Sequence, residues 1–444
     1  MFFQHCVRFL SCSIALCAFV SVASAQTDLA PLFAPPTTVE IEAVRADWNT
    51  RDLAWTDWSI IDESTSGGHR IQLVRYVLGG DDLYAMLRFP RNESSPVWPV
   101  MLWHHGGTSG LDADDLLTFD ADHTGDCLAD SFLVIAPTYR SEAFRGGSGL
   151  TARTSEGAPS PFDRDADDAM ALLNAVLDNM PQASPTLVRQ WGRSRGANVA
   201  WHVTLRDQRV VRTTAYFAPT DFRYADIQSK CQQAEDTGVP STDSLAKRVM
   251  SFIVEPWLAG TTSLAEARHQ LTAWSVLPFL DSPLAVQIHH GESDDRVPVV
   301  HGQDAVAALV VGGAVAPEFA AYFYPGGSHG MTGLAGHADR TEDYLCSISV
   351  TTGITIRPTV DSLTIWPNPT RGRVVFSLRS DAVATGEYGI FDVVGRKVGQ
   401  VMVPPGDQVG WSAYDKAGRV LPSGLYLARR VDGSAPASRF LLMR

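Results

Sequence analysis

Hydrophobic positions along the chain gather in short runs, and the stretches between the runs show either helical spacing or turn residues. Mostly apolar, strand-like runs lie at residues 98–103, 132–137, 186–188, 212–217, 283–289 and 319–324. Residues 165–177 instead place their apolar side chains on one face of a helix. Strands that alternate with helices predict an α/β fold, in which a doubly wound, mostly parallel sheet carries helices on both faces.

The segments around this pattern predict three further features. Residues 69–78 and 83–89 are strand-like runs joined by Gly79-Gly80-Asp81-Asp82, which is typical of a hairpin. Residues 26–51 are rich in proline and alanine and are expected to form a loose lead-in. Residues 221–278 are mostly helical in pattern, so we expect them to cover the carboxyl edge of the sheet as a helical cap.

Beyond Cys346 the pattern changes to short β-type runs with turn residues between them. The runs lie about 8 to 14 residues apart, which predicts a small all-β, immunoglobulin-like sandwich. We therefore expect an α/β domain over residues 26–350, a linker over residues 351–359 and the sandwich over residues 360–444.

The first 25 residues are expected to be a secretory signal. Arg8 precedes an apolar stretch over residues 9–22, and Ala23-Ser24-Ala25 supplies small residues for cleavage. A membrane anchor needs about 20 unbroken apolar residues. The apolar stretch is shorter, so the segment predicts export without a stable membrane span.

Charge excludes one class of partner. The chain has 36 basic and 49 acidic residues, and removal of the signal takes away only Arg8, which changes the formal net charge from −13 to −14. Such a surface repels phosphate backbones, and no local cluster of Lys or Arg offsets it. Nucleic acid is therefore not expected as a partner.

Three cysteines, Cys127, Cys231 and Cys346, remain after removal of the signal. They allow at most one disulfide bridge and leave one thiol over, and the pairing stays open. Their wide spacing matches neither a disulfide framework nor a zinc site.

The candidate nucleophile is Ser194, within Gly192-Arg193-Ser194-Arg195-Gly196. This stretch follows a strand-like run and precedes a helix-like one. A serine at the tip of a sharp strand-to-helix turn crowds any Cβ two residues away, so glycine is needed at both positions.

Two later loops carry the other candidates, again directly after strand-like runs. His290-Gly291 leads to Asp294, with Asp295 as an adjacent rival, and Gly327-Ser328 leads to His329. Ligands bind at the carboxyl ends of parallel strands, where all these loops fall. The chain order Ser194, Asp294, His329 is that of α/β-hydrolases.

These residue types predict acyl transfer. His329 would take the proton of the serine and return it to the leaving group, while Asp294 would orient the imidazole. The oxyanion would be bound by the backbone N–H of Arg195 and by that of Gly106 or Gly107, with Gly107 preferred.

No metal or cofactor is expected. The pairs His104-His105 and His289-His290 are neighbours on strand ends, where successive side chains point in opposite directions. Residues 120–126 resemble the first half of a calcium loop, but Ser131 stands where a bidentate Glu belongs, so an acidic loop is expected there.

Three stretches resemble the catalytic domain of the prolyl oligopeptidase family of serine peptidases. They are residues 191–197, the stretch from His290-Gly291 through Asp294 to Val297-Pro298, and residues 327–330. The resemblance covers about Leu83 to Leu345, and its H-G-x-x-D-x-x-V-P spacing selects Asp294 over Asp295. It implies an ester of Ser194 as intermediate and peptides as substrates.

Two departures from the family keep other functions open. Ala197 stands where the family often has a second glycine, and too few residues precede the hairpin for the β-propeller that limits substrate size in that family. A carboxylesterase that acts on small or polysaccharide-linked acyl groups is therefore the alternative to a peptidase. A non-catalytic surface-binding protein on a hydrolase scaffold is a third hypothesis.

The carboxyl-terminal residues are similar to the type A sorting domain of the type IX secretion system. The similarity rests on Trp366-Pro367-Asn368-Pro369, on residues 390–398 and on Pro422-Ser423-Gly424-Leu425-Tyr426, and it covers about residues 360–444. It implies the type IX secretion machinery as a partner and delivery to the cell surface or the medium.

Overall fold

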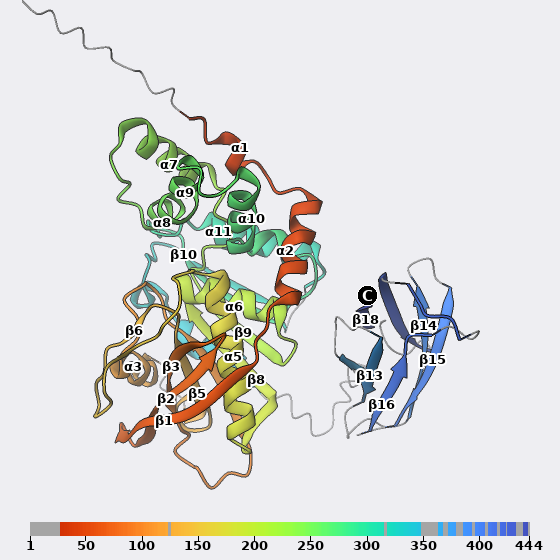
Figure 1. Ribbon diagram of the computed structural model, residues 1–444. Coiled ribbons are helices and arrows are strands. Elements are labelled where there is room, and N and C mark those ends of the chain that lie inside the picture. The colour runs from red at the N-terminus through yellow and green to blue at the C-terminus, as the bar shows by residue number, and fades with distance from the viewer. Residues whose placement is uncertain are drawn as a thin grey trace, which may run out of the picture.

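A computed structural model describes residues 27–122, 126–314 and 318–347. Beyond them it describes residues 363–366, 372–378, 385–392, 396–404, 407–414, 418–422, 424–431 and 438–442. The predicted signal and the predicted linker lie outside the described residues. The described residues form an α/β part, which ends at Ser347, and a set of carboxyl-terminal strands (Figure 1).

A nine-stranded sheet forms the centre of the α/β part, in the order β1-β2-β3-β5-β4-β8-β9-β10-β11. From β5 to β11 neighbouring strands are parallel, whereas β1, β2, β3 and β5 pair antiparallel. The strands are β1 (Trp55–Ser66), β2 (His69–Leu78), β3 (Asp81–Arg88), β4 (Trp98–His104), β5 (Leu133–Thr138), β8 (Ala183–Arg193), β9 (Val210–Tyr216), β10 (Val286–Gly291) and β11 (Ala320–Tyr324). The predicted hairpin is present as β2 and β3.

Helices cover both faces of this sheet. Alternate side chains of a strand point to opposite faces, and in β2 Val74 and Tyr76 pack under α5 (Asp163–Asn179), while Ile71 and Leu73 belong to the core on the other face. The first face also carries α6 (Arg195–Arg206) and α11 (Val300–Val311). The second carries α3 (Ala113–Asp122), α4 (Asp126–Asp130) and α12 (His337–Cys346). This mixed sheet between two helical layers fits an α/β-hydrolase.

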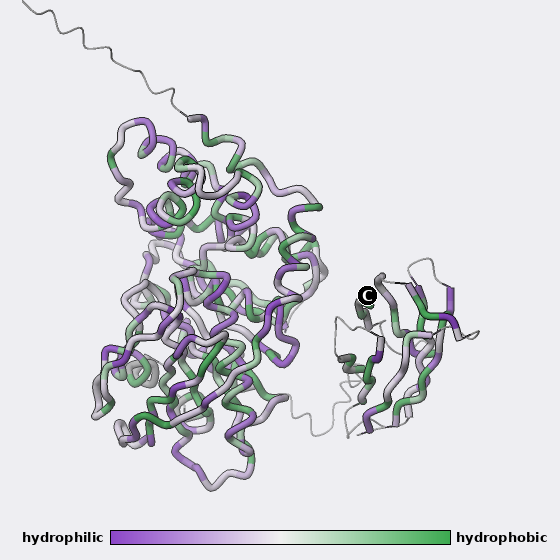
Figure 2. Tube along the Cα trace, in the orientation of Figure 1, coloured by the Kyte–Doolittle hydropathy of each residue, from purple (hydrophilic) through white to green (hydrophobic). Residues whose placement is uncertain are grey.

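The hydropathy of the trace follows the same layers. Figure 2 shows hydrophobic stretches in the strands and hydrophilic stretches in outer loops and on helices. The expectation of an acidic loop over residues 120–126 is wrong in part, because α3 extends to Asp122 and α4 begins at Asp126.

Short helices between β9 and β10 form the predicted cap. They are α7 (Ala225–Thr237), α8 (Ser244–Val249), a π-helical turn η1 (Met250–Val254), α9 (Glu255–Leu258), α10 (Leu264–Trp274) and a 3-10 turn η2 (Leu277–Phe279). Their apolar faces share a core of their own, which includes Phe222, Ile253 and Trp274. In Figure 1 they lie beyond one edge of the sheet.

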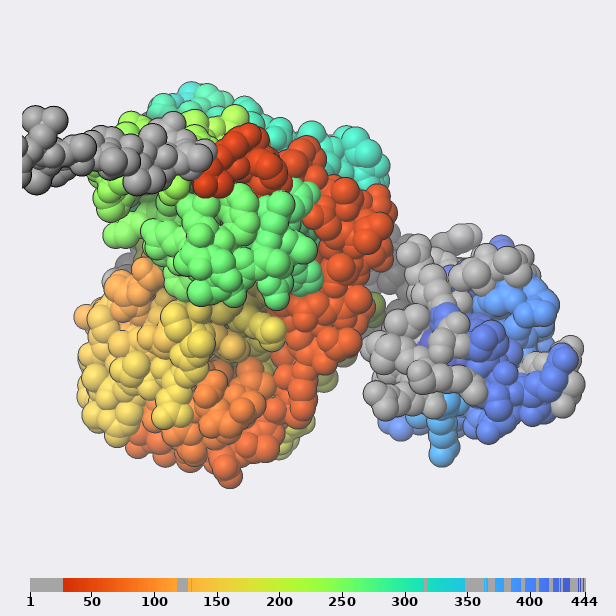
Figure 3. Space-filling model, turned by 45° about the horizontal axis from the view of Figure 1, so that its top comes forward, coloured from red at the N-terminus to blue at the C-terminus, as the bar shows by residue number. Residues whose placement is uncertain are grey.

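The amino-terminal segment is helical, which corrects the expectation of a loose lead-in. It contains α1 (Ala30–Phe33) and α2 (Thr38–Thr50), and α2 begins with a capping box in which Thr37 and Glu40 satisfy each other's backbone N–H. Arg268 of α10 binds Glu40 and the carbonyl oxygen of Pro31. Figure 3 shows this red segment lying against the green cap.

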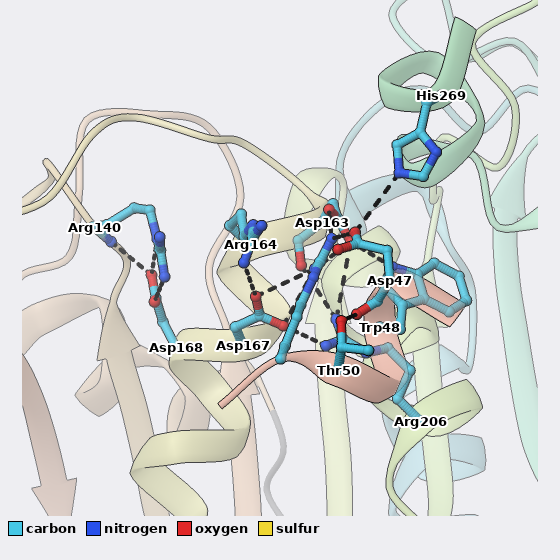
Figure 4. Close-up of polar contacts among 11 residues, drawn as sticks. Asp47, Trp48, Thr50, Arg140, Asp163, Arg164, Asp167, Asp168, Arg206 and His269 are labelled. Atoms are coloured by element: carbon cyan, nitrogen blue, oxygen red, sulfur yellow. Dashed lines mark hydrogen bonds and ion pairs between the residues drawn. The ribbon is translucent and has the colours of Figure 1, made fainter. Parts of the chain in front are cut away.

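Buried ion pairs join α2 to the helical layer. Arg51, at the end of α2, lies 2.7 Å from Asp163 and 3.2 Å from Asp167 of α5. Arg206 of α6 contacts Asp167 as well. Figure 4 shows Asp163, Asp167 and Arg206 in this network, with Asp47 beside them. Since every member contacts an opposite charge, the desolvation cost of each one is offset.

A disulfide joins Cys127 of α4 to Cys346 at the end of α12, and Cys231 is a buried free thiol. The pairing that the sequence leaves open is therefore resolved. Among the described residues, no helix has the length and apolarity needed to cross a membrane.

The carboxyl-terminal strands form two small antiparallel sheets. One contains β12 (Thr364–Trp366), β13 (Arg373–Ser377) and β16 (Gln408–Ser412). The other contains β15 (Lys397–Val403), β14 (Gly386–Asp392), β17 (Gly424–Arg430) and β18 (Ser438–Leu442). Side chains of both sheets, such as Phe376, Ile390 and Phe440, share one core. An all-β arrangement is present here, and its immunoglobulin-like character stays a prediction.

Candidate active site

Ser194 occupies the turn between β8 and α6. Its backbone has φ 53° and ψ −124°, a conformation that residues other than glycine rarely adopt. The N–H of Ser194 donates to the carbonyl of Tyr216 in β9 at 2.9 Å, which holds the turn against the sheet. The hydroxyl is therefore fixed at the carboxyl end of β8.

The loops after β10 and β11 bring the other two candidates to the same edge. A Cβ on Gly291 would lie 2.4 Å from the carbonyl oxygen of Gly327, so the two loops touch backbone to backbone. The N–H of Ser293 also donates to Gly327 at 2.8 Å. These contacts place Asp294 and His329 side by side.

The three side chains form a continuous chain of hydrogen bonds. Nε2 of His329 lies 3.0 Å from Oγ of Ser194, and Nδ1 of His329 lies 2.7 Å from Oδ2 of Asp294. With the proton on Nδ1, the carboxylate accepts it and Nε2 is free to accept from the serine. Phe217 packs on the imidazole, with 4.5 Å between ring centroids. The structure thus brings together three residues that are far apart in the sequence.

Asp294 is held in its ionised form, and its neighbour Asp295 points to solvent. Burial acts to raise the pKa of Asp294, but the hydrogen bonds from His329 and from the backbone N–H groups of Val297 and Arg296 outweigh it and lower the pKa. Asp295 is exposed. The carboxylate beside the imidazole is therefore the one that the spacing selects.

His290 lies close to the same carboxylate without competing for the role of His329. Its Nε2 is 3.7 Å from Asp294 and donates to the carbonyl oxygen of Val297 at 2.8 Å. Burial lowers its pKa, which keeps it neutral. His290 supports the loop of Asp294 from behind.

Two backbone N–H groups belong to residues that lie beside Ser194. Arg195 is the first residue of α6, and Gly107 follows β4 with φ 71°. Neither N–H is hydrogen-bonded to another described residue, and both residues line the cavity that holds Ser194. The amino end of a helix carries partial positive charge, which favours an oxygen anion there.

The side chain of Arg195 has a structural role that the sequence motifs do not predict. Its Nη1 donates to the carbonyl oxygen of Gly107 at 2.9 Å and contacts Glu142, while its Nε donates to Asp165 at 2.8 Å. Burial acts against the charge of Arg195, but the two carboxylates outweigh it and raise its pKa. Arg195 therefore has its own backbone N–H at the cavity, and its side chain also holds the loop that contains Gly107. Glu142 and Asp165 lie 53 and 30 residues from Arg195 in sequence, with no motif to link them.

A cavity of about 330 Å³ opens at the serine. Its apolar wall includes Phe162, Phe217, Leu245 and Met331, and Leu245 belongs to α8 of the cap. The size suits a small ligand or one side chain of a larger one.

Two other histidines, His104 and His105, are buried and neutral. Burial lowers the pKa of His104 to about 4 and that of His105 to about 3. His104 hydrogen-bonds Gln190, and His105 stacks on Tyr139. Within the described residues, no group of three or more His, Cys, Asp or Glu side chains could hold a metal ion.

No family model matches the chain, and no curated protein matches it. Among solved structures, the chain is similar to acetyl xylan esterase 1 from Thermoanaerobacterium sp., with 15% identity, 72% of this chain and 98% of that chain covered, and a TM-score of 0.48. It is similar to a puromycin-hydrolysing peptidase of Mycobacterium tuberculosis, with 18% identity, coverage of 66% and 47%, and a TM-score of 0.44. It is also similar to an α/β hydrolase from Penicillium sp., with 16% identity, coverage of 65% and 98%, and a TM-score of 0.41. The sequence identities and the TM-scores are low, so the chemistry of the site has to be derived from its own side chains.

Proposed function

We propose that this protein is a serine hydrolase that transfers acyl groups through an ester of Ser194. The observation that carries the proposal is the chain of hydrogen bonds from Ser194 through His329 to Asp294, at 3.0 and 2.7 Å. A serine hydroxyl is a poor nucleophile at neutral pH unless a base takes its proton. In this proposal His329 is that base, and Asp294 stabilises the imidazolium that forms.

The proposed reaction has two halves. Oγ of Ser194 attacks the substrate carbonyl while Nε2 of His329 takes the hydroxyl proton, and the N–H groups of Arg195 and Gly107 bind the oxyanion. The tetrahedral intermediate then expels the leaving group, which receives the proton from His329. Water then attacks the acyl carbon while Nε2 of His329 takes its proton. The bond from the acyl carbon to Oγ breaks, the acid leaves, and Oγ of Ser194 receives the proton from His329.

A serine-type peptidase is the first candidate, because the sequence motifs around all three residues resemble that class. A carboxylesterase is the second, and one observation favours it. The cavity at Ser194 measures about 330 Å³ and residues of α8 line it, which leaves room for a small acyl group more readily than for an extended peptide.

A fluorophosphonate probe tests the shared proposal. We expect the probe to label the purified protein and the variant S194A to lose labelling while its circular dichroism spectrum is unchanged. Continued labelling of S194A would contradict the proposal, and absence of labelling in the wild type would favour the non-catalytic binding protein.

Turnover of 4-nitrophenyl acetate, measured beside chromogenic peptides, distinguishes the two candidates. Cleavage of both substrate classes supports the peptidase, since serine peptidases also form acyl-enzymes from activated esters. Cleavage of the ester alone supports the carboxylesterase.

We also propose that the protein is exported, with residues 1–25 as the signal and residues 360–444 as the address for type IX secretion. The sequence features given above support this, and the acidic surface is compatible with it. In a host with that machinery, deletion of residues 360–444 should leave the protein in the periplasm, as measured by immunoblots of cell fractions. Unchanged delivery to the surface or the medium would contradict it.

A further inference from the structure

The arginines that line the cavity at Ser194 are opposite in sign to the net charge of the whole protein. Arg193, Arg248 and Arg296 line the cavity together with the paired Arg195, and among the described residues no aspartate or glutamate does. The chain as a whole has a formal net charge of −13. The cavity is therefore a cationic region in an acidic protein, and such a region attracts anions.

Arg248 is the central member of this set. It extends from α8 of the cap, and its Nη2 donates to Oγ1 of Thr108 at 3.0 Å. Among the described residues no carboxylate lies within ion-pair distance of its guanidinium. Burial, followed by the charge of Arg195, lowers the pKa of Arg248 to about 10, and the charges of Glu142 and Asp165 oppose this shift only in part. The guanidinium therefore remains charged at neutral pH.

The two other arginines also retain free hydrogen-bonding capacity. Arg296 is exposed at the rim, and its side chain has no ion pair among the described residues. Arg193 is 42% exposed and reaches Asp115 only at 3.9 Å. By contrast, the buried arginines Arg51 and Arg195 each contact two or more carboxylates.

A partly buried cation without a counter-ion is costly, and a ligand that supplies the counter-charge would remove that cost. Thr108, which Arg248 contacts, directly follows Gly107 in the loop beside Ser194. Arg248 therefore lines the same cavity as Gly107 and Ser194, at the loop next to the serine. The planar fork of an arginine matches a carboxylate in two parallel hydrogen bonds.

We propose that the substrate carries a carboxylate within a few bonds of the scissile carbonyl, bound by Arg248 with Arg193 and Arg296 around it. This inference rests on the proposed serine hydrolase. The apolar wall, with Phe162 and Phe217, accommodates the rest of an amphipathic acyl or leaving group. Arg248 is a specificity residue here and takes no part in bond making.

Two matched pairs of esters test the proposal. The first compares mono(4-nitrophenyl) adipate with 4-nitrophenyl hexanoate, which places the charge in the acyl group. The second compares 4-acetoxybenzoate with its methyl ester, which places the charge in the leaving group. For at least one pair, we expect kcat/KM to be about tenfold or more higher for the carboxylate member, after subtraction of hydrolysis by S194A. The pair that shows the preference identifies the charged side of the substrate.

Variants assign the preference to Arg248. R248Q should lower the ratio of kcat/KM within that pair by about 10- to 100-fold, and R248K should retain part of it. R296Q changes an exposed rim residue and should lower the same ratio by a few fold. The matched control is R91Q, which removes an arginine that is paired with Asp130 outside the cavity and should leave the ratio unchanged. Added salt should reduce the preference in the wild type, because it screens the charges.

A ratio near one for both pairs in the wild type would overturn the proposal, and so would a preference that R248Q and R296Q both leave intact. Fluorophosphonate labelling of Ser194 is measured on the same samples. Labelling without a carboxylate preference contradicts only this inference, whereas loss of labelling contradicts the serine hydrolase itself.

Discussion

At the scale of single residues, the position of Ser194 depends on two glycines, Gly192 and Gly196, because they have no Cβ atom. A Cβ on Gly196 would lie 2.2 Å from the carbonyl oxygen of His104, and one on Gly192 would lie 2.4 Å from that of Gly196. These contacts allow α6 to approach β4 and β8 closely. The pattern Gly-x-Ser-x-Gly therefore has a steric cause in this fold, and the motif could be identified from sequence for that reason.

The adjacent acids Asp294 and Asp295 provide a test at this scale. We expect D294N to lower kcat by about 10³- to 10⁴-fold, because an amide cannot stabilise the imidazolium and favours the wrong tautomer of His329. D295N is the matched control, and since Asp295 is exposed it should stay within about twofold of the wild type. Steady-state kinetics on 4-nitrophenyl acetate measures both, and equal losses would contradict the assignment of Asp294.

At the scale of elements, the amino-terminal segment connects parts that are distant in sequence. Glu40 of α2 binds Arg268 of the cap, while Arg51 at the other end of α2 binds Asp163 and Asp167 of α5. One helix therefore holds the cap to the layer that supports the sheet. The cap is fixed from its outer side as well as through its own core.

The ion pairs of Arg51 should dominate this connection. R51M removes a positive charge from the buried carboxylates of Asp163 and Asp167. We therefore expect it to lower the free energy of unfolding by about 3–5 kcal/mol. R45M is the matched control, since Arg45 makes only partly exposed ion pairs with Glu42 and Asp281 and should cost at most about 1 kcal/mol. Urea denaturation followed by tryptophan fluorescence compares them. A loss for R51M no larger than that for R45M would show that the network does not hold α2 in place.

The elements also show what the sequence could predict. The inner strands, α5 and the cap have strong apolar patterns and were predictable. The helix α2 was not, because prolines at 31, 35 and 36 obscured its start, although Thr37 and Glu40 have the spacing of a capping box. The edge strand β1 has no clear apolar pattern, because its half-exposed residues are mostly polar. The contacts of Arg195 with Glu142 and Asp165 depend on tertiary packing and leave no local signal.

At the scale of the whole molecule, buried histidines couple folding to pH. His104, His105, His202 and His301 are buried, and desolvation lowers their pKa values to about 4, 3, 4 and 3. In the unfolded chain a histidine has a pKa of about 6.5. Below that pH the unfolded state binds more protons than the folded state, so stability falls as the pH decreases toward 4.

Each such histidine should contribute about 1.4 kcal/mol per pH unit over that window. We expect H202Q, which can still donate to the carbonyl of Trp274, to reduce the loss of unfolding free energy between pH 6 and pH 4.5 by about 1 kcal/mol per pH unit. Urea titrations at several pH values measure the slope. An unchanged slope would mean that His202 is protonated in the folded state as well.

The disulfide between Cys127 and Cys346 closes a covalent loop of 219 residues in sequence separation, and Ser194, Asp294 and His329 all lie inside it. A mechanical pull between the two ends of the chain is transmitted through the sulfur atoms and bypasses the loop. A protein held by one end in flowing liquid or at a moving surface would thus keep its three reactive groups free of tension. Reduction of this single bond would place them directly in the path of the force.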